Sequence, residues 1–174
     1  MPTSLIINEI VLIALSGLLA WAAIRDLRTF TIPNWLCIAV AVLFIAHALS
    51  APHSVSWINS FIAGFVMFLG GFALFGANLM GGGDVKLMAA LGLWAGLDAI
   101  MQFLLVTSLA GGVLALVIGS RHWFSRVSAS DAHMSGSSDQ ATVGSESVRN
   151  LALPYGVAIA CGGLYVAARL FPVI

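Results

Sequence analysis

The sequence carries very little charge. Only 8% of its 174 residues are Asp, Glu, Lys or Arg, and the seven basic residues balance the seven acidic ones. A soluble domain carries about 25% charged residues, which cover its surface. The composition therefore excludes an ordinary water-soluble domain. It also provides no net positive charge for binding nucleic acid, so we predict no nucleic-acid partner.

Cysteine is also scarce, and the chain has no cysteine motif. Cys37 and Cys161 lie in separate apolar runs, without the CxxC or Cys/His spacing that a zinc site needs. The four histidines show no metal-ligand spacing either. We predict no metal site, and we expect both cysteines to be small, buried apolar side chains.

Long apolar runs are what the sequence has in abundance. Apolar residues make up 60% of the chain, and the mean hydropathy is +1.04. Crossing a hydrocarbon core of ~30 Å takes about 20 mostly apolar residues in a helix. The sequence therefore predicts an all-α polytopic membrane protein, a single membrane-embedded domain over residues 1–174 with about six transmembrane helices. The expected crossings are residues 5–24, 35–49, 57–79, 85–96, 99–118 and 151–171.

The fourth of these crossings is predicted to be short. As one helix, residues 85–119 would be ~52 Å long at 1.5 Å per residue, which exceeds a single bilayer. We place the break at residues 96–98, which contain Gly96 and Asp98. The polar segment 120–150, rich in Ser and Gly, is predicted to be a flexible cytoplasmic loop.

The basic residues predict the orientation of the chain. Retained cytoplasmic loops carry an excess of Lys and Arg, and six of the seven basic residues fall after odd-numbered crossings. These six are Arg25, Arg28, Lys86, Arg121, Arg126 and Arg149. We therefore predict that both termini are extracytoplasmic.

Two carboxylates share the predicted cytoplasmic face. Asp26 follows the first expected crossing and Asp84 follows the third. Two carboxyl groups that meet at a membrane edge can share a proton and act as general base and general acid. Two simpler interpretations stay open. The sole role of Asp84 could be to cap the helix that follows three glycines, and the sole role of Asp26 could be to pair with Arg25 or Arg28 at the headgroups.

Three sequence motifs carry a resemblance to a known family. They are RDLRTFTIPNWL at residues 25–36, GGGDVKLMAALGLW at residues 81–94, and Pro-Tyr-Gly at residues 154–156. With these motifs the chain resembles the type IV prepilin peptidases, especially the minimal form found with Tad/Flp pilus systems. The resemblance covers most of the chain except residues 120–150.

The resemblance implies a GxGD-type intramembrane aspartic endopeptidase with Asp26 and Asp84 as catalytic residues. Such an enzyme cleaves the basic leader from prepilins and pseudopilins at the cytoplasmic face of the inner membrane, where its partners are membrane lipid and the pilus assembly machinery. Water attacks the scissile carbonyl, and no metal or cofactor is needed. Larger members carry a CxxC-containing insert associated with methylation of the new N-terminus; this chain lacks it, so methyl transfer is not expected.

The remaining motif residues are predicted to shape the site or bind substrate, although Lys86 could also be only a topogenic charge. These residues are Gly81, Gly83, Lys86, Pro33, Asn34, Pro154, Tyr155 and Gly156.

Two other functions remain open from the residues. A small transporter or proton-path subunit also carries intramembrane acids and glycine-rich breaks, but it would favour acids near the midplane or on both faces. An inactive scaffold of the pilus machinery could retain both aspartates.

Overall fold

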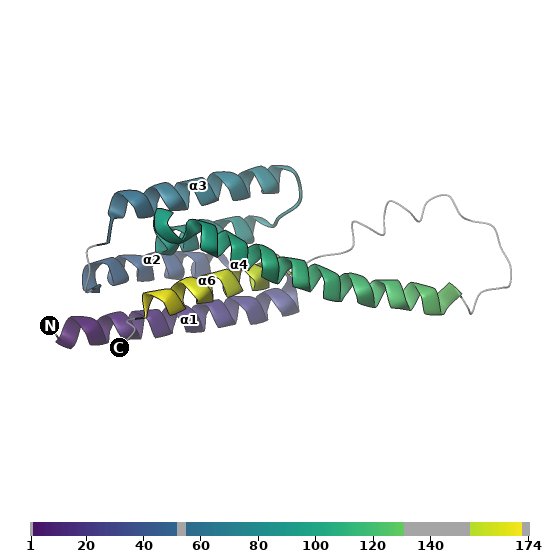
Figure 1. Ribbon diagram of the computed structural model, residues 1–174, viewed down its shortest axis with the longest axis horizontal. Helices are drawn as coiled ribbons and strands as arrows, with labels where there is room; N and C mark the ends of the chain where they lie inside the picture. Colours follow the sequence, from purple (N-terminus) through teal and green to yellow (C-terminus); the bar gives the residue numbers. More distant parts are fainter. Residues whose placement is uncertain (1, 52–54, 131–153, 172–174) are drawn as a thin grey trace.

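The computed structural model describes residues 2–51, 55–130 and 154–171, and within these ranges it contains helices and no strand. The prediction of an all-α protein is confirmed. Figure 1 shows the helices lying along a common direction, with the start of α1 and the end of α6 at the same end of the bundle. The helices are α1 (Pro2–Thr29), α2 (Asn34–Ser50), α3 (Trp57–Gly76), α4 (Gly82–Ser130) and α6 (Tyr155–Leu170).

Three helical segments are long and apolar enough to cross a membrane, and two more helices, α2 and α6, are apolar but shorter. The large apolar side chains on the outside of the bundle, such as Ile13 and Phe65 at 62% exposure, are those of a protein surrounded by lipid. These features indicate an integral membrane protein. The number of six crossings is not confirmed. The three long segments are Thr3–Thr29, Trp57–Gly76 and Gly82–Ser120.

Helix α4 bends at Gly96, where the backbone has φ 57° and ψ −178°. This left-handed φ is one that glycine adopts without steric cost. The predicted break at residues 96–98 is therefore confirmed. In Figure 1 the first half of α4 lies within the bundle, and the second half returns past α6 and extends beyond it.

The second half of α4 continues further than expected. It remains helical to Ser130, which is inside the segment predicted to be a polar loop. Residues 131–150, the rest of that predicted loop, lie outside the described residues.

Helix α1 is also longer than its apolar run. The predicted first crossing ends at residue 24, but the backbone N–H of Phe30 still donates to Asp26 O at 2.9 Å and the hydroxyl of Thr29 donates to Arg25 O at 2.9 Å. The helix ends only where Phe30 adopts a left-handed φ of 50°. Asp26 therefore lies in the last turn of a helix and not in a loop.

The first half of α4 forms the centre of the bundle. Its side chains Leu87, Leu91 and Trp94 are at most 4% exposed. Helices α2, α3 and α6 all pack against α4, and α1 packs against α2 and α6. Leucines of α1 complete the buried apolar core. This arrangement brings the first turn of α4 close to the end of α1 and the start of α6.

One polar pair ties α1 to α2 inside the core. His47 Nδ1 lies 2.6 Å from Asn8 Oδ1, and both residues are buried. The His47 ring stacks on Trp94 with 5.0 Å between ring centroids, while Trp94 Nε1 donates to Val40 O at 3.0 Å. Buried polar groups in an apolar interior are stable when they are hydrogen-bonded in this way.

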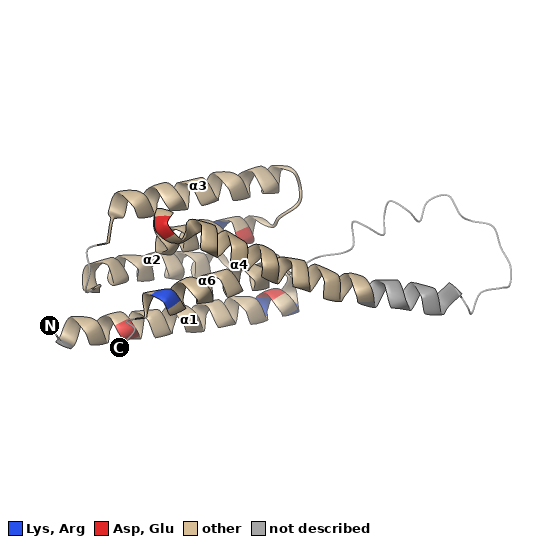
Figure 2. Ribbon diagram, in the orientation of Figure 1, with Lys and Arg blue, Asp and Glu red and all other residues tan. Residues whose placement is uncertain are grey.

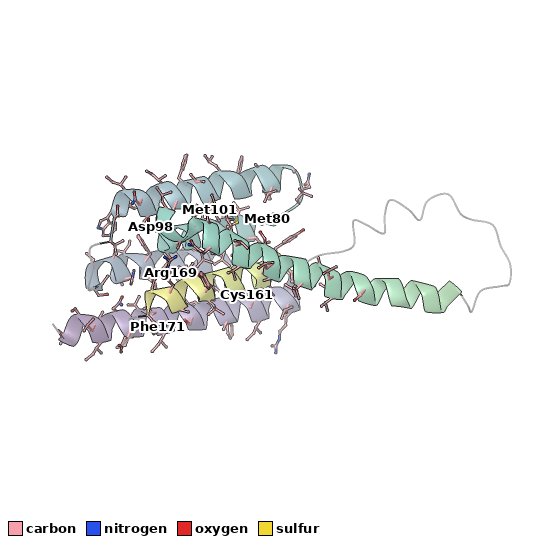
Figure 3. The ribbon with its side chains drawn as sticks, in the orientation of Figure 1. Met80, Asp98, Met101, Cys161, Arg169 and Phe171 are labelled. Carbon is pink, nitrogen blue, oxygen red and sulfur yellow. The ribbon has the colours of Figure 1, made fainter. Side chains whose placement is uncertain are left out.

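The expectation for the cysteines is half right. Cys37 is buried, but Cys161 is exposed, and neither forms a disulfide. Figure 3 labels Cys161 on α6, where it borders an apolar groove with Val106 and Leu109 of α4. The apolar run around Cys161 predicted burial in protein, whereas a helix at a bundle surface in lipid is apolar on its outer side as well.

Glycines allow α3 and α4 to pack closely. A methyl group built on Gly92 would lie 2.9 Å from Gly64 Cα and 3.1 Å from Ala63 O. Small residues at such contacts let helix backbones approach each other in membranes.

We expect Gly92→Ala to lower the free energy of unfolding by about 1–3 kcal/mol, the usual cost of overpacking. The matched control is Gly70→Ala on α3, because nothing lies within 4 Å of a methyl group built there, and it should be neutral or stabilising. The measurement is unfolding by SDS titration in mixed micelles. Equal stability of the two variants would contradict the close α3–α4 contact.

Candidate active site

Asp26 lies at the meeting point of α1 and α6. Its side chain is only 3% exposed, and its Oδ2 accepts a hydrogen bond of 3.2 Å from the backbone N–H of Val157. Val157 is in the first turn of α6, where backbone N–H groups lack partners within the helix and the helix dipole favours a negative charge. The start of α6 therefore provides Asp26 with a donor.

Gly156 leaves the room that Asp26 occupies. A methyl group built on Gly156 would lie 2.8 Å from Asp26 Oδ2 and 2.8 Å from Ile32 Cδ1. Real Cβ atoms do not approach other heavy atoms so closely. A larger residue at position 156 would thus displace the carboxyl group or Ile32.

Asp84 lies in the first turn of α4, which begins at Gly82. Its side chain is 9% exposed and receives a backbone hydrogen bond from Gly81. A methyl group on Gly81 would lie 3.1 Å from Asp84 Oδ2. The residue that precedes α4 is Gly81, so Asp84 is not the N-cap residue. Asp84 lies three positions after the N-cap, and its carboxylate accepts a hydrogen bond from the Gly81 N–H, as the acid of a capping box does.

The two carboxylates are brought to one end of the bundle, and the Asp26 carboxylate acts electrostatically on Asp84. Ile32 packs beside both carboxylates. Its side chain contacts the position of a methyl group built on Gly156, and its carbonyl oxygen lies 3.0 Å from the position of a methyl group built on Gly83. Figure 2 shows a cluster of charged residues at the end of the bundle where α1 ends, and few charged residues elsewhere on the described helices.

The arginine-pairing interpretation of Asp26 is not supported by the contacts. Asp26 accepts a hydrogen bond from the Val157 N–H. In the described part of the chain, it forms no ion pair with Arg25 or Arg28. Arg25 Nε is buried without a hydrogen-bond partner.

The residues of the Ile-Pro-Asn and Val-Lys-Leu motifs are also brought together. Lys86 Nζ donates to Asn34 Oδ1 at 2.8 Å, and Cys37 Sγ lies 3.7 Å from Gly83 O. Asn34 and Lys86 form the polar part of an otherwise apolar groove of about 680 Å³ between α2, α3 and the first half of α4.

The two prolines precede helices. Pro33 is the residue before α2, and Pro154 is the residue before α6, positions at which the missing N–H costs nothing. Pro154 and Gly156 are buried and Tyr155 is half-buried. Tyr155 has no contact that assigns it a role at the carboxylates.

Metal-ligating residues do not gather at the site. Among the side chains described in residues 3–51, 55–120 and 154–171 there is no group of three His, Cys, Asp or Glu able to hold a metal ion. The chemistry available at this end of the bundle is that of two carboxyl groups, two helix starts and a nearby ammonium group.

Two contacts at this site were not predicted from the sequence. The Val157 donor is a backbone group, so its identity gives no signal in the sequence. Ile32 was recognised only as part of a motif, yet it packs between the segments that carry Asp26 and Asp84.

Comparison with known proteins identifies the family. The family model of the type IV leader peptidase family matches residues 13–116, and the chain therefore belongs to this family. The sequence is also 50% identical, over 44 residues, to a prepilin leader peptidase/N-methyltransferase from Xanthomonas campestris pv. campestris. That alignment covers 25% of this chain and 15% of the relative. No solved structure matches the chain.

The contact between Ile32 and Gly83 can be tested by cross-linking. The Ile32 Cβ lies 3.1 Å from the position of a Gly83 Cβ, so a shift of a few tenths of an ångström brings the pair into the range of about 3.5–4.5 Å that a disulfide needs. We expect Ile32→Cys combined with Gly83→Cys to form a disulfide on mild oxidation, in a background with Cys37→Ala and Cys161→Ala. Mass spectrometry with thiol alkylation measures it.

The control pairs Ile32→Cys with Gly76→Cys, because Gly76 has nothing within 4 Å of a built methyl group. This control should keep both thiols. Failure of the Ile32/Gly83 pair to oxidise would contradict the packing of the Ile-Pro-Asn segment against the first turn of α4.

Proposed function

We propose that this chain is an aspartic endopeptidase that removes the leader from type IV prepilins and pseudopilins, with Asp26 and Asp84 as its catalytic residues. The observation that carries the proposal is the convergence of two buried carboxylates, far apart in sequence, at one end of a bundle. Membership of the type IV leader peptidase family supports a peptidase, and the name of the matching relative supports prepilin substrates.

The proposed reaction needs one carboxylate and one carboxylic acid. The carboxylate takes a proton from water as the water oxygen attacks the scissile carbonyl carbon, and the carboxylic acid gives its proton to the carbonyl oxygen. The tetrahedral intermediate then collapses, the C–N bond breaks, and a proton passes to the leaving amine. The two products are a peptide carboxylate and a new N-terminus, and no covalent enzyme intermediate forms.

The surroundings of the pair support this chemistry. Backbone N–H groups at the starts of α4 and α6 hold the carboxyl groups in fixed orientations, which keeps the reacting geometry preorganised. We propose that Gly81, Gly83 and Gly156 shape the site. Pro33 and Pro154 would act by fixing the helix starts beside it, with Tyr155 next to Pro154.

The groove that contains Asn34 and Lys86 is the proposed entrance for substrate. It is mostly apolar, it opens between α2 and α3, and Lys86 follows Asp84 by two residues on α4. An extended or helical segment of a membrane-embedded substrate could reach the carboxylates from this side.

The proposed membrane placement follows from the basic residues. We propose six crossings, with α4 counted as two across the bend at Gly96, in the inner membrane. Both termini would then be extracytoplasmic, and the carboxylate pair would lie at the cytoplasmic face. Flp-type prepilins and the pilus assembly machinery are the proposed substrates and partners. We do not propose methyl transfer, because the chain has no CxxC insert.

The carboxylate pair can be tested with isosteric variants. Asp26→Asn and Asp84→Asn each remove the ionisable group, and each should lower cleavage at least about 100-fold, the usual contribution of a general acid or base. The assay is cleavage of a co-expressed prepilin from the same genome, read by gel shift and product mass. Glu9→Gln is the control, because Glu9 is an exposed acid elsewhere on α1.

An aspartate whose asparagine variant cleaves at the wild-type rate is a structural residue, and the proposed mechanism would then be wrong. A wild-type chain that is inert on several prepilins would instead favour the scaffold interpretation.

The role of Gly156 has its own test. Gly156→Ala should displace the Asp26 carboxyl group and slow cleavage about 10–100-fold, because small displacements of reacting groups cost this much. Gly112→Ala is the control, since a methyl group at position 112 has nothing within 4 Å. Similar rates for the two variants would separate Gly156 from the function of Asp26.

A further inference from the structure

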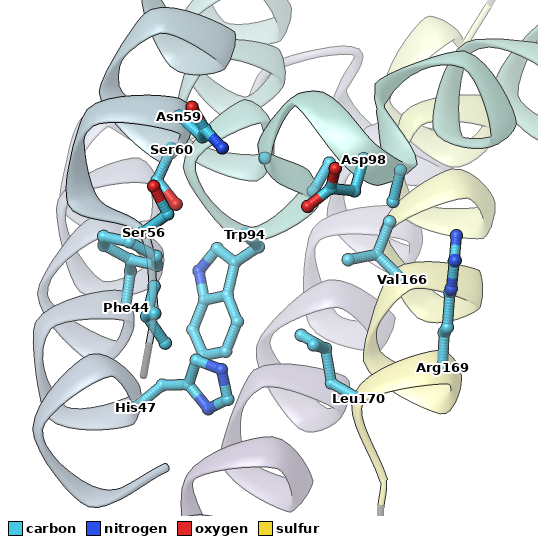
Figure 4. Close-up of a pocket in the computed structure, with 14 residues that line it drawn as sticks. Phe44, His47, Ser56, Asn59, Ser60, Trp94, Asp98, Val166, Arg169 and Leu170 are labelled. Carbon is cyan, nitrogen blue, oxygen red and sulfur yellow. The ribbon is translucent and has the colours of Figure 1, made fainter. Parts of the chain in front are cut away.

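A polar cavity that includes neither Asp26 nor Asp84 lies beside the bend of α4 and the last turn of α6. Its volume is about 300 Å³, which is at the lower end of the range for small-ligand pockets. Figure 4 shows the cavity between α2 and α3 on one side and α4 and α6 on the other, with Trp94 between them. None of its lining residues has a role in the proposed peptidase reaction.

Two opposite charges face this cavity from different helices. Asp98 lies two residues after the bend at Gly96, and Arg169 lies in the last turn of α6. In Figure 4 the carboxylate of Asp98 points into the cavity and Arg169 stands on the α6 wall. The described part of the chain contains no ion pair between them. A ligand that carries both charges could therefore be bound by both side chains.

Buried polar side chains line the same cavity. Ser60 is 5% exposed, and its hydroxyl makes no hydrogen bond to any residue that the structure describes. His47 is 6% exposed and uses Nδ1 for Asn8, so its second ring nitrogen has no partner among the described residues. Buried polar groups are nearly always hydrogen-bonded in native structures. Their free bonding capacity indicates a polar occupant.

Exposed apolar side chains lie beside Asp98 on α4. Leu97 and Met101 flank Asp98 on α4 and are 42% and 73% exposed, and Figure 3 places Met101 close to Asp98. On a helix that crosses a membrane, such side chains contact acyl chains. An occupant with a zwitterionic end and apolar chains would satisfy both parts of this surface.

We propose that this cavity binds the headgroup of a phospholipid that carries a phosphate and a primary ammonium group. The Arg169 guanidinium binds the phosphate oxygens, a pairing that its planar donors favour. Asp98 and the Ser60 hydroxyl accept hydrogen bonds from the ammonium group. The acyl chains lie along Leu97 and Met101. The site is independent of the proposed peptidase activity.

The test compares three lipids on the purified full chain in detergent by native mass spectrometry. Phosphatidylethanolamine has both charges and an N–H donor, phosphatidylcholine has no N–H donor, and phosphatidylglycerol has no cation. We expect phosphatidylethanolamine to be retained at least about 10-fold more strongly than the other two, a modest difference in binding free energy. Equal retention of all three lipids would overturn the proposal without any variant.

The variants assign the two charges. Asp98→Asn should remove the preference for phosphatidylethanolamine over phosphatidylglycerol, and Arg169→Gln should weaken both. The conservative Asp98→Glu should keep the preference, which separates a lost charge from a damaged fold. Glu9→Gln, an exposed acid that does not line the cavity, should bind like wild type. An unchanged preference in Asp98→Asn would overturn the assignment.

Soluble glycerophosphoethanolamine distinguishes the two sources of this chemistry. It should displace the lipid only weakly, because it lacks the acyl chains. Displacement as strong as that by phosphatidylethanolamine itself would mean that a free zwitterion occupies the cavity, and the lipid proposal would be wrong.

Discussion

The structure depends on one constraint, which is that two carboxylates must be buried in an apolar bundle. An unpaired charge among apolar side chains is costly unless donors surround it. The chain meets this constraint with two helix starts: α6 presents the Val157 N–H to Asp26, and the start of α4 presents Gly81 to Asp84. Both helix starts therefore lie near the end of α1.

Glycine makes that arrangement possible in two separate places. Gly92 and Gly64 let α3 rest closely against the first half of α4, and Gly156 lets the start of α6 approach Asp26. The bend at Gly96 has a different cause, because it needs a left-handed backbone more than it needs space. Together these glycines allow the other helices to pack around the first half of α4, which is a short helical segment that ends at the bend.

The proposed peptidase site and the proposed lipid site occupy different parts of the bundle and involve different chemistry. The first has two acids, Asp26 and Asp84, near helix starts; the second has one acid and one base, Asp98 and Arg169, around a cavity. The first half of α4 connects them, since it begins beside Asp84 and ends at the Gly96 bend next to Asp98.

The sequence by itself determined the helical class and the bend near Gly96, and it predicted that Asp26 and Asp84 share one face, because hydropathy, glycine and motif spacing are local signals. It did not determine the end of α1, since hydropathy marks where apolar residues stop and not where backbone hydrogen bonds stop. Only the tertiary structure decided the exposure of Cys161, the Val157 donor and the position of Ile32. These depend on which face of a helix meets its neighbours, and in lipid both faces are apolar.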